Sequence, residues 1–337
     1  MIFALCAGAG LVYVRVWYDA PLAGVTAPVT IEIAPGEGAS AVATRLAKAG
    51  VLDQPKLWVF FARYQGDQSR LRAGEYEIEP GTTPEGLLEQ LVEGRVLLHP
   101  VTIVDGWTAA DAVRALAQSP FLHRVLPAPD SLGADHAWLV AAGGPDASAE
   151  GQFYPDTYLV ARGTSDADVL KLAHARMAEE LNAAWAARAA DLPLAGPYDA
   201  LILASLIEKE TAAPDERPMI AAVFINRLRK NMRLQTDPSV IYGLGPKYDG
   251  SLHHKDVTTD TPYNTYTRAG LPPTPIALPG RDALRAAVAP ADSTAIYFVA
   301  TGKGDGRHVF STTLAAHEAA VSRYVARARA AGRPTSR

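Results

Sequence analysis

The sequence predicts an α+β protein with a small N-terminal domain and a larger C-terminal one. The 337 residues correspond to roughly two domains of about 150 residues each. Short alternating strands near the N-terminus each precede a glycine turn and an amphipathic helix, and longer helical patterns separated by Pro- and Gly-rich stretches follow. We therefore expect an anchor at 1–18, a linker at 19–28, a small domain at 29–97, a larger domain at 98–325 and a basic tail at 326–337.

The N-terminal segment is apolar enough to suggest a membrane anchor. Residues 1–14 carry no charge, Arg15 lies close to the end of the run, and Trp17 with Tyr18 extends it. A helix over residues 1–18 would be ~27 Å long, slightly less than the ~30 Å thickness of the hydrocarbon layer. Arginine can reach the headgroups there, and Trp and Tyr are typical of membrane interfaces. A cleaved signal peptide is one alternative, but the sequence has neither the positively charged start nor the well-placed cleavage site that a signal peptide needs. A buried helix is the other alternative.

The small domain contains a weak internal repeat. Strands at 31–33 and 76–78 each lead through a glycine turn and a Ser or Thr cap into a helix, and a third such unit begins at 102–104. An additional apolar helix is expected at 55–64. True repetition and chance similarity of short units both account for this pattern.

The larger domain is expected to be mainly helical. A hairpin is predicted from the strands Ile296–Ala300 and Val309–Thr312, which flank a glycine-rich turn. Residues 232–280 have little periodicity and many polar side chains, which is typical of a long functional loop. Helices are predicted at Ala109–Ala117, Asp166–Arg188, Tyr198–Thr211, Glu216–Asn231, Asp282–Val288 and Leu314–Arg329.

Composition excludes several function classes. Thirty-two basic and 36 acidic residues leave a net charge of -4, which provides no general attraction to nucleic acid. Cys6 is the only cysteine, so neither an intrachain disulfide nor a zinc site with several thiolates is expected. We interpret His253, His254 and Asp256 as polar loop residues, and no G-x-S-x-G hydrolase motif occurs. No metal or organic cofactor is predicted.

A glutamate in the helix predicted at 198–211 is the main catalytic candidate. At about 100° per residue, Glu210 falls between Leu206 and Ile207 on the apolar face, whereas Glu208 lies away from it. Desolvation and the negative end of the helix dipole should both raise the pKa of the Glu210 carboxyl. A protonated glutamate near neutral pH is what glycosidic bond cleavage requires. The structural alternative is that Glu210 points outward to a cation such as Arg217.

The following helix has a polar residue, Asn226, at the equivalent place on its apolar face. Two such residues indicate either a shared site or a single buried Glu–Asn hydrogen bond. Further polar and aromatic residues occupy the expected long loop, and such side chains commonly contact sugars. The candidates for contacts to a substrate, or to the groups around it, are Asn226, Gln235, Asp237, Asn264 and Tyr266.

Several motifs together resemble those of a known family. They are A-S-L-I-E-K-E-T at 204–211, V-F-I-N-R-L at 223–228, R-L-Q-T-D-P-S-V-I-Y-G at 233–243, Y-N-T-Y at 263–266, G-L-P-P at 270–273, Y-P-D-T-Y at 154–158 and Y-F-V-A at 297–300. In this order, over about residues 31–324, they resemble the YceG-like (MltG) endolytic murein transglycosylases.

The resemblance implies a bacterial single-pass inner-membrane protein whose catalytic domain faces the periplasm. It implies that residues 29–97 form a LysM-like subdomain and that Glu210, the second glutamate of E-K-E, is the catalytic acid and base. Such enzymes cleave the MurNAc–GlcNAc β-1,4 bond of nascent peptidoglycan and leave 1,6-anhydro-MurNAc ends, which limits strand length. Glycan strands, the membrane and peptidoglycan synthases are the implied partners.

Two alternatives remain at this point. A peptidoglycan hydrolase would need a second carboxylate to activate water, and Asp237 is the best candidate. A non-catalytic glycan-binding scaffold of the cell-wall synthesis complex would tolerate Glu210→Gln.

Overall fold

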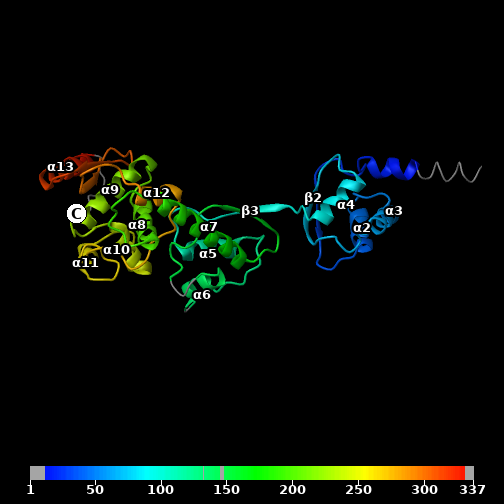
Figure 1. Ribbon diagram of the computed structural model, residues 1–337, viewed down its shortest axis with the longest axis horizontal. Coiled ribbons are helices and arrows are strands. Elements are labelled where there is room, and N and C mark those ends of the chain that lie inside the picture. Colours follow the sequence, from blue (N-terminus) through cyan, green and yellow to red (C-terminus); the bar gives the residue numbers. More distant parts are fainter. Residues whose placement is uncertain (1–11, 132, 145–147, 331–337) are drawn as a thin grey trace, which may run out of the picture. The chain divides into compact units, whose positions relative to one another are not determined.

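The computed structural model describes residues 12–131, 133–144 and 148–330 of this mixed α+β protein (Figure 1). The chain forms two compact units. One holds the chain up to Pro100 together with Leu159–Thr164, and the other holds Val101–Tyr158 and the chain from Ser165 onward. Each unit has its own hydrophobic core.

The first unit packs three helices on a two-stranded antiparallel sheet. Strand β1 (Val29–Ile33) pairs with β2 (Gly74–Ile78), and Ile31 lies opposite Tyr76. Apolar side chains on one face of both strands are buried, as the alternating sequence predicts. The Thr83 side chain caps the helix that begins at Pro84 by accepting a hydrogen bond from the backbone N–H of Gly86. The helices are α2 (Ala39–Lys48), α3 (Pro55–Tyr64) and α4 (Pro84–Glu93).

The N-terminal part of the described chain packs into this first unit. Residues 12–19 are helical, and the Tyr18 ring, expected at a membrane interface, is buried and stacks on Phe61 with centroids 4.0 Å apart. Leu22 and Val25, in the segment expected to be a linker, belong to the core. The first part of the expected anchor, residues 1–11, lies outside the described residues. Among those described, no helix is long and apolar enough to cross a membrane.

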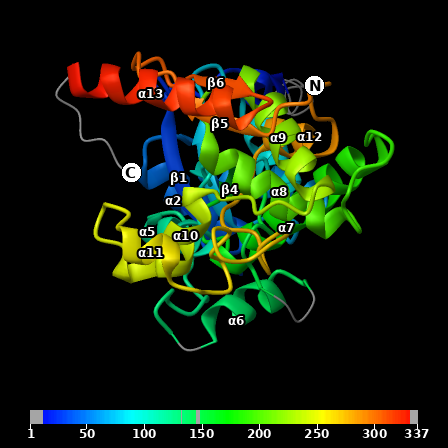
Figure 2. The same cartoon turned by 90° about the vertical axis from the view of Figure 1, so that its left-hand side faces the viewer.

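The second unit is mainly helical. Strand β3 (Leu98–Thr102) pairs with β4 (Thr157–Ala161), and β5 (Tyr297–Ala300) forms an antiparallel hairpin with β6 (His308–Ser311). Figure 2 shows α13 (Leu314–Ala330) lying along this hairpin. This helix runs past residue 326, where the sequence predicts a tail.

One buried helix, α8 (Pro197–Glu210), lies at the centre of the second unit. It packs against helices on several sides because almost every residue from Ala200 to Ile207 is apolar. The helices of this unit are α5 (Ala109–Gln118), α6 (Ala134–Ala141), α7 (Asp166–Ala186), α8, α9 (Arg217–Arg229), α10 (Asp237–Leu244), α11 (His254–Thr258), α12 (Arg281–Val288) and α13. The predicted long loop at 232–280 thus includes α10 and α11.

Candidate active site

Glu210 is the last residue of α8 and is partly exposed, whereas most of the helix before it is buried. Desolvation of its carboxyl raises the pKa to about 7, and the nearby charge of Asp237 adds to this increase. The Thr236 hydroxyl donates a hydrogen bond of 2.5 Å to Glu210 Oε1, which favours the ionised form and limits the rise. Among the described residues, Oε2 accepts no hydrogen bond. Glu210 therefore has one oxygen fixed and the other available to a ligand.

Glu208 lies two residues earlier and is held within the protein. Its Oε1 is 2.6 Å from a guanidinium nitrogen of Arg217, and its Oε2 accepts the backbone N–H of Gly280 at 2.9 Å. The structural alternative raised for Glu210 is therefore wrong, because Arg217 pairs with Glu208. This pair joins the end of α8 to the starts of α9 and α12.

The hydroxyl that contacts Glu210 is held by a buried network of backbone and side-chain bonds. The Thr236 N–H donates to Thr265 Oγ1 at 3.0 Å, and the hydroxyls of Ser239 and Thr265 are 2.9 Å apart. The Gln235 N–H donates to the Thr265 carbonyl at 3.1 Å. Gln235 is exposed and has a φ of 50°, which is a costly conformation for a non-glycine residue. The network thus holds a strained turn beside the candidate acid.

Asp237 and Tyr266 form a pair next to Glu210. The Tyr266 hydroxyl donates a hydrogen bond of 2.5 Å to Asp237 Oδ1. Burial raises the pKa of Tyr266, and the charges of Asp237 and Glu210 raise it further. Asp237 is exposed at the first residue of α10, so its carboxylate is accessible from solvent.

Asn264 supports this pair from within the protein. Its side chain is fully buried, and its amide donates to the carbonyls of Asp256, Val257 and Thr259. Its Oδ1 accepts the Tyr266 N–H at 2.9 Å. Asn264 therefore acts on the groups around the site, since its side chain has no surface for a substrate.

Asn226 is not part of the Glu210 cluster of hydrogen bonds. Its amide donates to the carbonyls of Ser293 and Ala295, at 2.7 and 3.0 Å. These bonds hold the segment before β5, and they use both N–H groups of the amide. The hypothesis of a direct Glu–Asn hydrogen bond is therefore wrong.

Arg227 is a site residue that the sequence interpretation missed. Its guanidinium is buried and donates to the carbonyls of Ile296 and Leu234, at 2.7 and 2.6 Å. Its positive charge opposes the rise in the pKa of Glu210. An arginine within an apolar helix was the available signal, since such a residue needs partners when buried.

Glu150 is a second buried carboxyl that the sequence interpretation missed. Its Oε1 accepts the N–H of Ala109 at 3.0 Å, and its Oε2 accepts the hydroxyl of Tyr242, on α10, at 3.1 Å. Desolvation raises the pKa of Glu150 to about 7. Both of its oxygens are bound internally and the residue is only 4% exposed, so it braces α10 rather than facing a ligand.

The His253 region shows the local contacts expected of a polar loop. His253 Nε2 lies 3.1 Å from Asp249, and the His253 N–H donates to Asp256 at 2.9 Å. Within the described ranges, no group of three or more His, Cys, Asp or Glu side chains could hold a metal ion.

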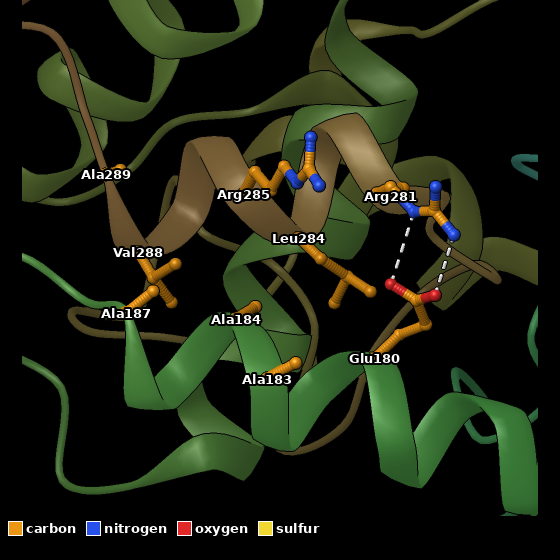
Figure 3. A pocket seen from close by; sticks show the side chains of 9 residues that line it. All are labelled: Glu180, Ala183, Ala184, Ala187, Arg281, Leu284, Arg285, Val288 and Ala289. Atoms are coloured by element: carbon orange, nitrogen blue, oxygen red, sulfur yellow. Dashed lines mark hydrogen bonds and ion pairs between the residues drawn. The ribbon is translucent and has the colours of Figure 1, made fainter.

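A cavity of about 320 Å³ lies between α7 and α12 (Figure 3), and the residues that line it include none of those predicted for the site. Alanine side chains of α7 and the apolar residues Leu284 and Val288 of α12 line it. Arg281 binds Glu180 at its edge through two nitrogens, at 2.8 and 3.2 Å. Since this ion pair spans the two helices, it joins α7 to α12.

Comparisons with known proteins match most of this chain to one family. The YceG-like family matches residues 31–323. The endolytic murein transglycosylase of Bacillus subtilis is 30% identical over 317 residues, covering 88% of this chain and 85% of that protein. The protein of the same name from Streptococcus pneumoniae is 28% identical, covering 88% of this chain and 58% of its own.

A solved structure shows the same fold. The crystal structure of a yceG-like protein from Listeria monocytogenes aligns with a TM-score of 0.53 at 29% identity. The alignment covers 87% of this chain and 98% of that one. This chain therefore belongs to the YceG-like family.

Proposed function

We propose that this protein is an endolytic murein transglycosylase. It would cleave the MurNAc–GlcNAc β-1,4 bond within nascent peptidoglycan strands and leave 1,6-anhydro-MurNAc ends. Family membership and the names of the relatives support the general activity. The observation that carries the chemistry is the Glu210 carboxyl, which has a pKa of about 7 and one unbound oxygen.

In the first step, protonated Glu210 gives its proton to the glycosidic oxygen. The bond between that oxygen and C1 of MurNAc breaks, and positive charge develops at C1. A pKa of about 7 keeps a substantial fraction of the carboxyl protonated near neutral pH. Thr236 holds Oε1, so the free oxygen Oε2 is the atom that would face the leaving group.

In the second step, the Glu210 carboxylate removes the proton of the sugar's own C6 hydroxyl. The C6 oxygen attacks C1 and closes the 1,6-anhydro ring, which regenerates the protonated carboxyl and consumes no water. Because the nucleophile belongs to the same sugar, the reaction is intramolecular, and one carboxyl suffices.

Asp237 defines the alternative reaction. It is an exposed carboxylate whose charge acts on Glu210, so it could activate a water molecule in a hydrolase. In the lytic reaction, its role is electrostatic, because its negative charge helps to keep the Glu210 proton in place. The chemical nature of the new ends distinguishes these reactions.

We further propose that the N-terminal segment attaches the protein to the bacterial inner membrane, with the catalytic domain in the periplasm. The uncharged sequence of residues 1–14 supports this proposal. Glycan strands would then be the substrate, and peptidoglycan synthases, which supply new strands, would be partners.

Mass spectrometry of the products tests the proposal. Detergent-solubilised full-length protein is incubated with uncrosslinked peptidoglycan strands, beside the Glu210→Gln and Glu208→Gln variants. Internal fragments ending in 1,6-anhydro-MurNAc, formed by the wild type and Glu208→Gln but not by Glu210→Gln, are expected. Reducing ends would indicate hydrolysis and assign a role to Asp237. Glycan binding without cleavage by the wild type would indicate a scaffold.

A further inference from the structure

One face of α3 in the first unit is apolar although it is exposed. Phe60 and Tyr64 are 58% and 80% exposed. Their rings lie nearly parallel, with centroids 6.3 Å apart, because residues four apart share one face of a helix. Trp58 and Ala62 supply the buried face. This helix therefore has apolar residues on both its inner and its outer surfaces.

Positive charges flank the exposed aromatic pair. Lys56 and Arg63 are exposed, and neither forms an ion pair among the described residues. Aromatic side chains on one helix face, with Lys or Arg beside them, are typical of helices that lie in a membrane interface. Such cations are attracted to anionic lipid headgroups.

The same helix adjoins the N-terminal segment. Tyr18 stacks on Phe61, and its hydroxyl donates a hydrogen bond of 3.1 Å to Gln65. Residues 12–19, which Tyr18 fixes to α3, expose the apolar side chains Val12, Tyr13 and Val16. The eleven residues before Val12 contain no charge. The exposed aromatic pair is therefore on α3, the same helix against which residues 12–19 pack.

We propose that the Phe60–Tyr64 face of α3 lies in the headgroup region of a lipid bilayer and forms a second membrane contact beside the N-terminal segment. The inference rests on the membrane attachment proposed above. The apolar start brings the bilayer to this end of the unit, the rings fit the interfacial layer, and Lys56 with Arg63 faces the lipid phosphates.

Site-specific fluorescence tests this contact in the full chain. Cys6 is the only cysteine, so Cys6→Ser provides a background in which Tyr64→Cys carries a single NBD fluorophore. Phe60→Cys is labelled in the same way as an independent variant. Glu32→Cys is the matched control, because Glu32 is an exposed residue on the outward face of β1. Each protein is reconstituted into phosphatidylethanolamine–phosphatidylglycerol vesicles with and without headgroup-spin-labelled lipid.

We expect the labels at 60 and 64 to be quenched several-fold more than the label at 32, and the difference to shrink when phosphatidylglycerol is omitted. Equal quenching at all three positions, in protein that floats with the vesicles, would overturn this contact alone. Protein that does not float would contradict the membrane attachment and this inference together. Production of anhydro ends in detergent is measured separately and does not depend on either result.

Discussion

Two glutamates near the C-terminus of α8, Glu208 and Glu210, have different surroundings. Glu208 is enclosed, with an arginine on one oxygen and a backbone N–H on the other. Glu210 has no ion pair among the described residues, a single hydroxyl donor and a partly exposed position. Burial raises the pKa of both. Burial alone therefore does not make a catalytic acid; the group must also keep an oxygen free for the substrate.

The largest expected effect is on the rate of bond cleavage. Glu210→Gln should lower the rate by about 10³-fold, because an amide can neither give nor take the proton. Glu208→Gln should stay within about fivefold of the wild type. Initial rates at pH 6 on uncrosslinked strands measure both. A similar loss of rate in the two variants would contradict the assignment of a catalytic role to Glu210 and a structural role to Glu208.

Glu150 sharpens the comparison, because its pKa is raised like that of Glu210 while both its oxygens are bound like those of Glu208. Its folded pKa of about 7 lies above the ordinary value of 4.5, so the folded state binds more protons. Stability should fall as pH rises from about 4.5 to about 7, by roughly 3 kcal/mol.

Glu150→Gln should remove much of this loss of stability with pH while bond cleavage is retained. Urea denaturation at pH 5, 6, 7 and 8 measures the slope, and Glu79→Gln, at an exposed position, is the control. Identical slopes in the wild type and Glu150→Gln would argue against the raised pKa.

Glu208 and Arg217 should matter for folding instead. Glu208→Ala should lower the free energy of unfolding by about 2 kcal/mol, because it leaves a largely buried arginine and the Gly280 N–H without an acceptor. Glu210→Gln should raise the free energy of unfolding at pH 8 by about 1 kcal/mol, since a partly desolvated carboxylate is removed. Chemical denaturation at pH 8 measures both signs. Destabilisation by both variants would contradict the contrast between the two environments.

The smallest expected effects are shifts of the pH profile of kcat/KM. Activity should fall above the pKa of Glu210, about 7, because the acid must be protonated. Asp237→Asn should move this limb to lower pH, since it removes a charge that raises the pKa. Thr236→Val should move it to higher pH, since it removes a hydrogen bond that lowers the pKa. Shifts in the same direction would contradict these assignments, and inactive Asp237→Asn would favour the hydrolase.

The amphipathic pattern of the sequence predicted most helices and placed Glu210 near the end of one, because both depend on local periodicity. Helix α3 and hairpin β5–β6 lie at or within one residue of the predicted positions. Helices α10 and α11 were missed because they are short and follow turns rather than a long apolar stripe. The periodicity that selected Asn226 could not show that its amide binds carbonyls close to β5, since that contact joins residues far apart in the chain.

The supporting residues of the site were harder to predict for a related reason. The hydroxyl of Thr265 holds Thr236 in place by accepting its backbone N–H, and the side-chain oxygen of Asn264 holds Tyr266 in the same way. Each contact depends on how two loops meet. A sequence pattern indicates that such loops are polar, but it does not fix which side chain faces Glu210.

The Leu159–Thr164 segment has a consequence for synthesis of the protein on the ribosome. It belongs to the first unit although Val101–Tyr158 of the second precedes it, and Arg162 reaches Glu75 at 3.2 Å. A nascent chain that has emerged only to Pro100 therefore lacks part of its first unit. Completion of that unit must wait until Val101–Tyr158 of the second unit has been translated, so the usual order of N-terminal domain first does not hold strictly here.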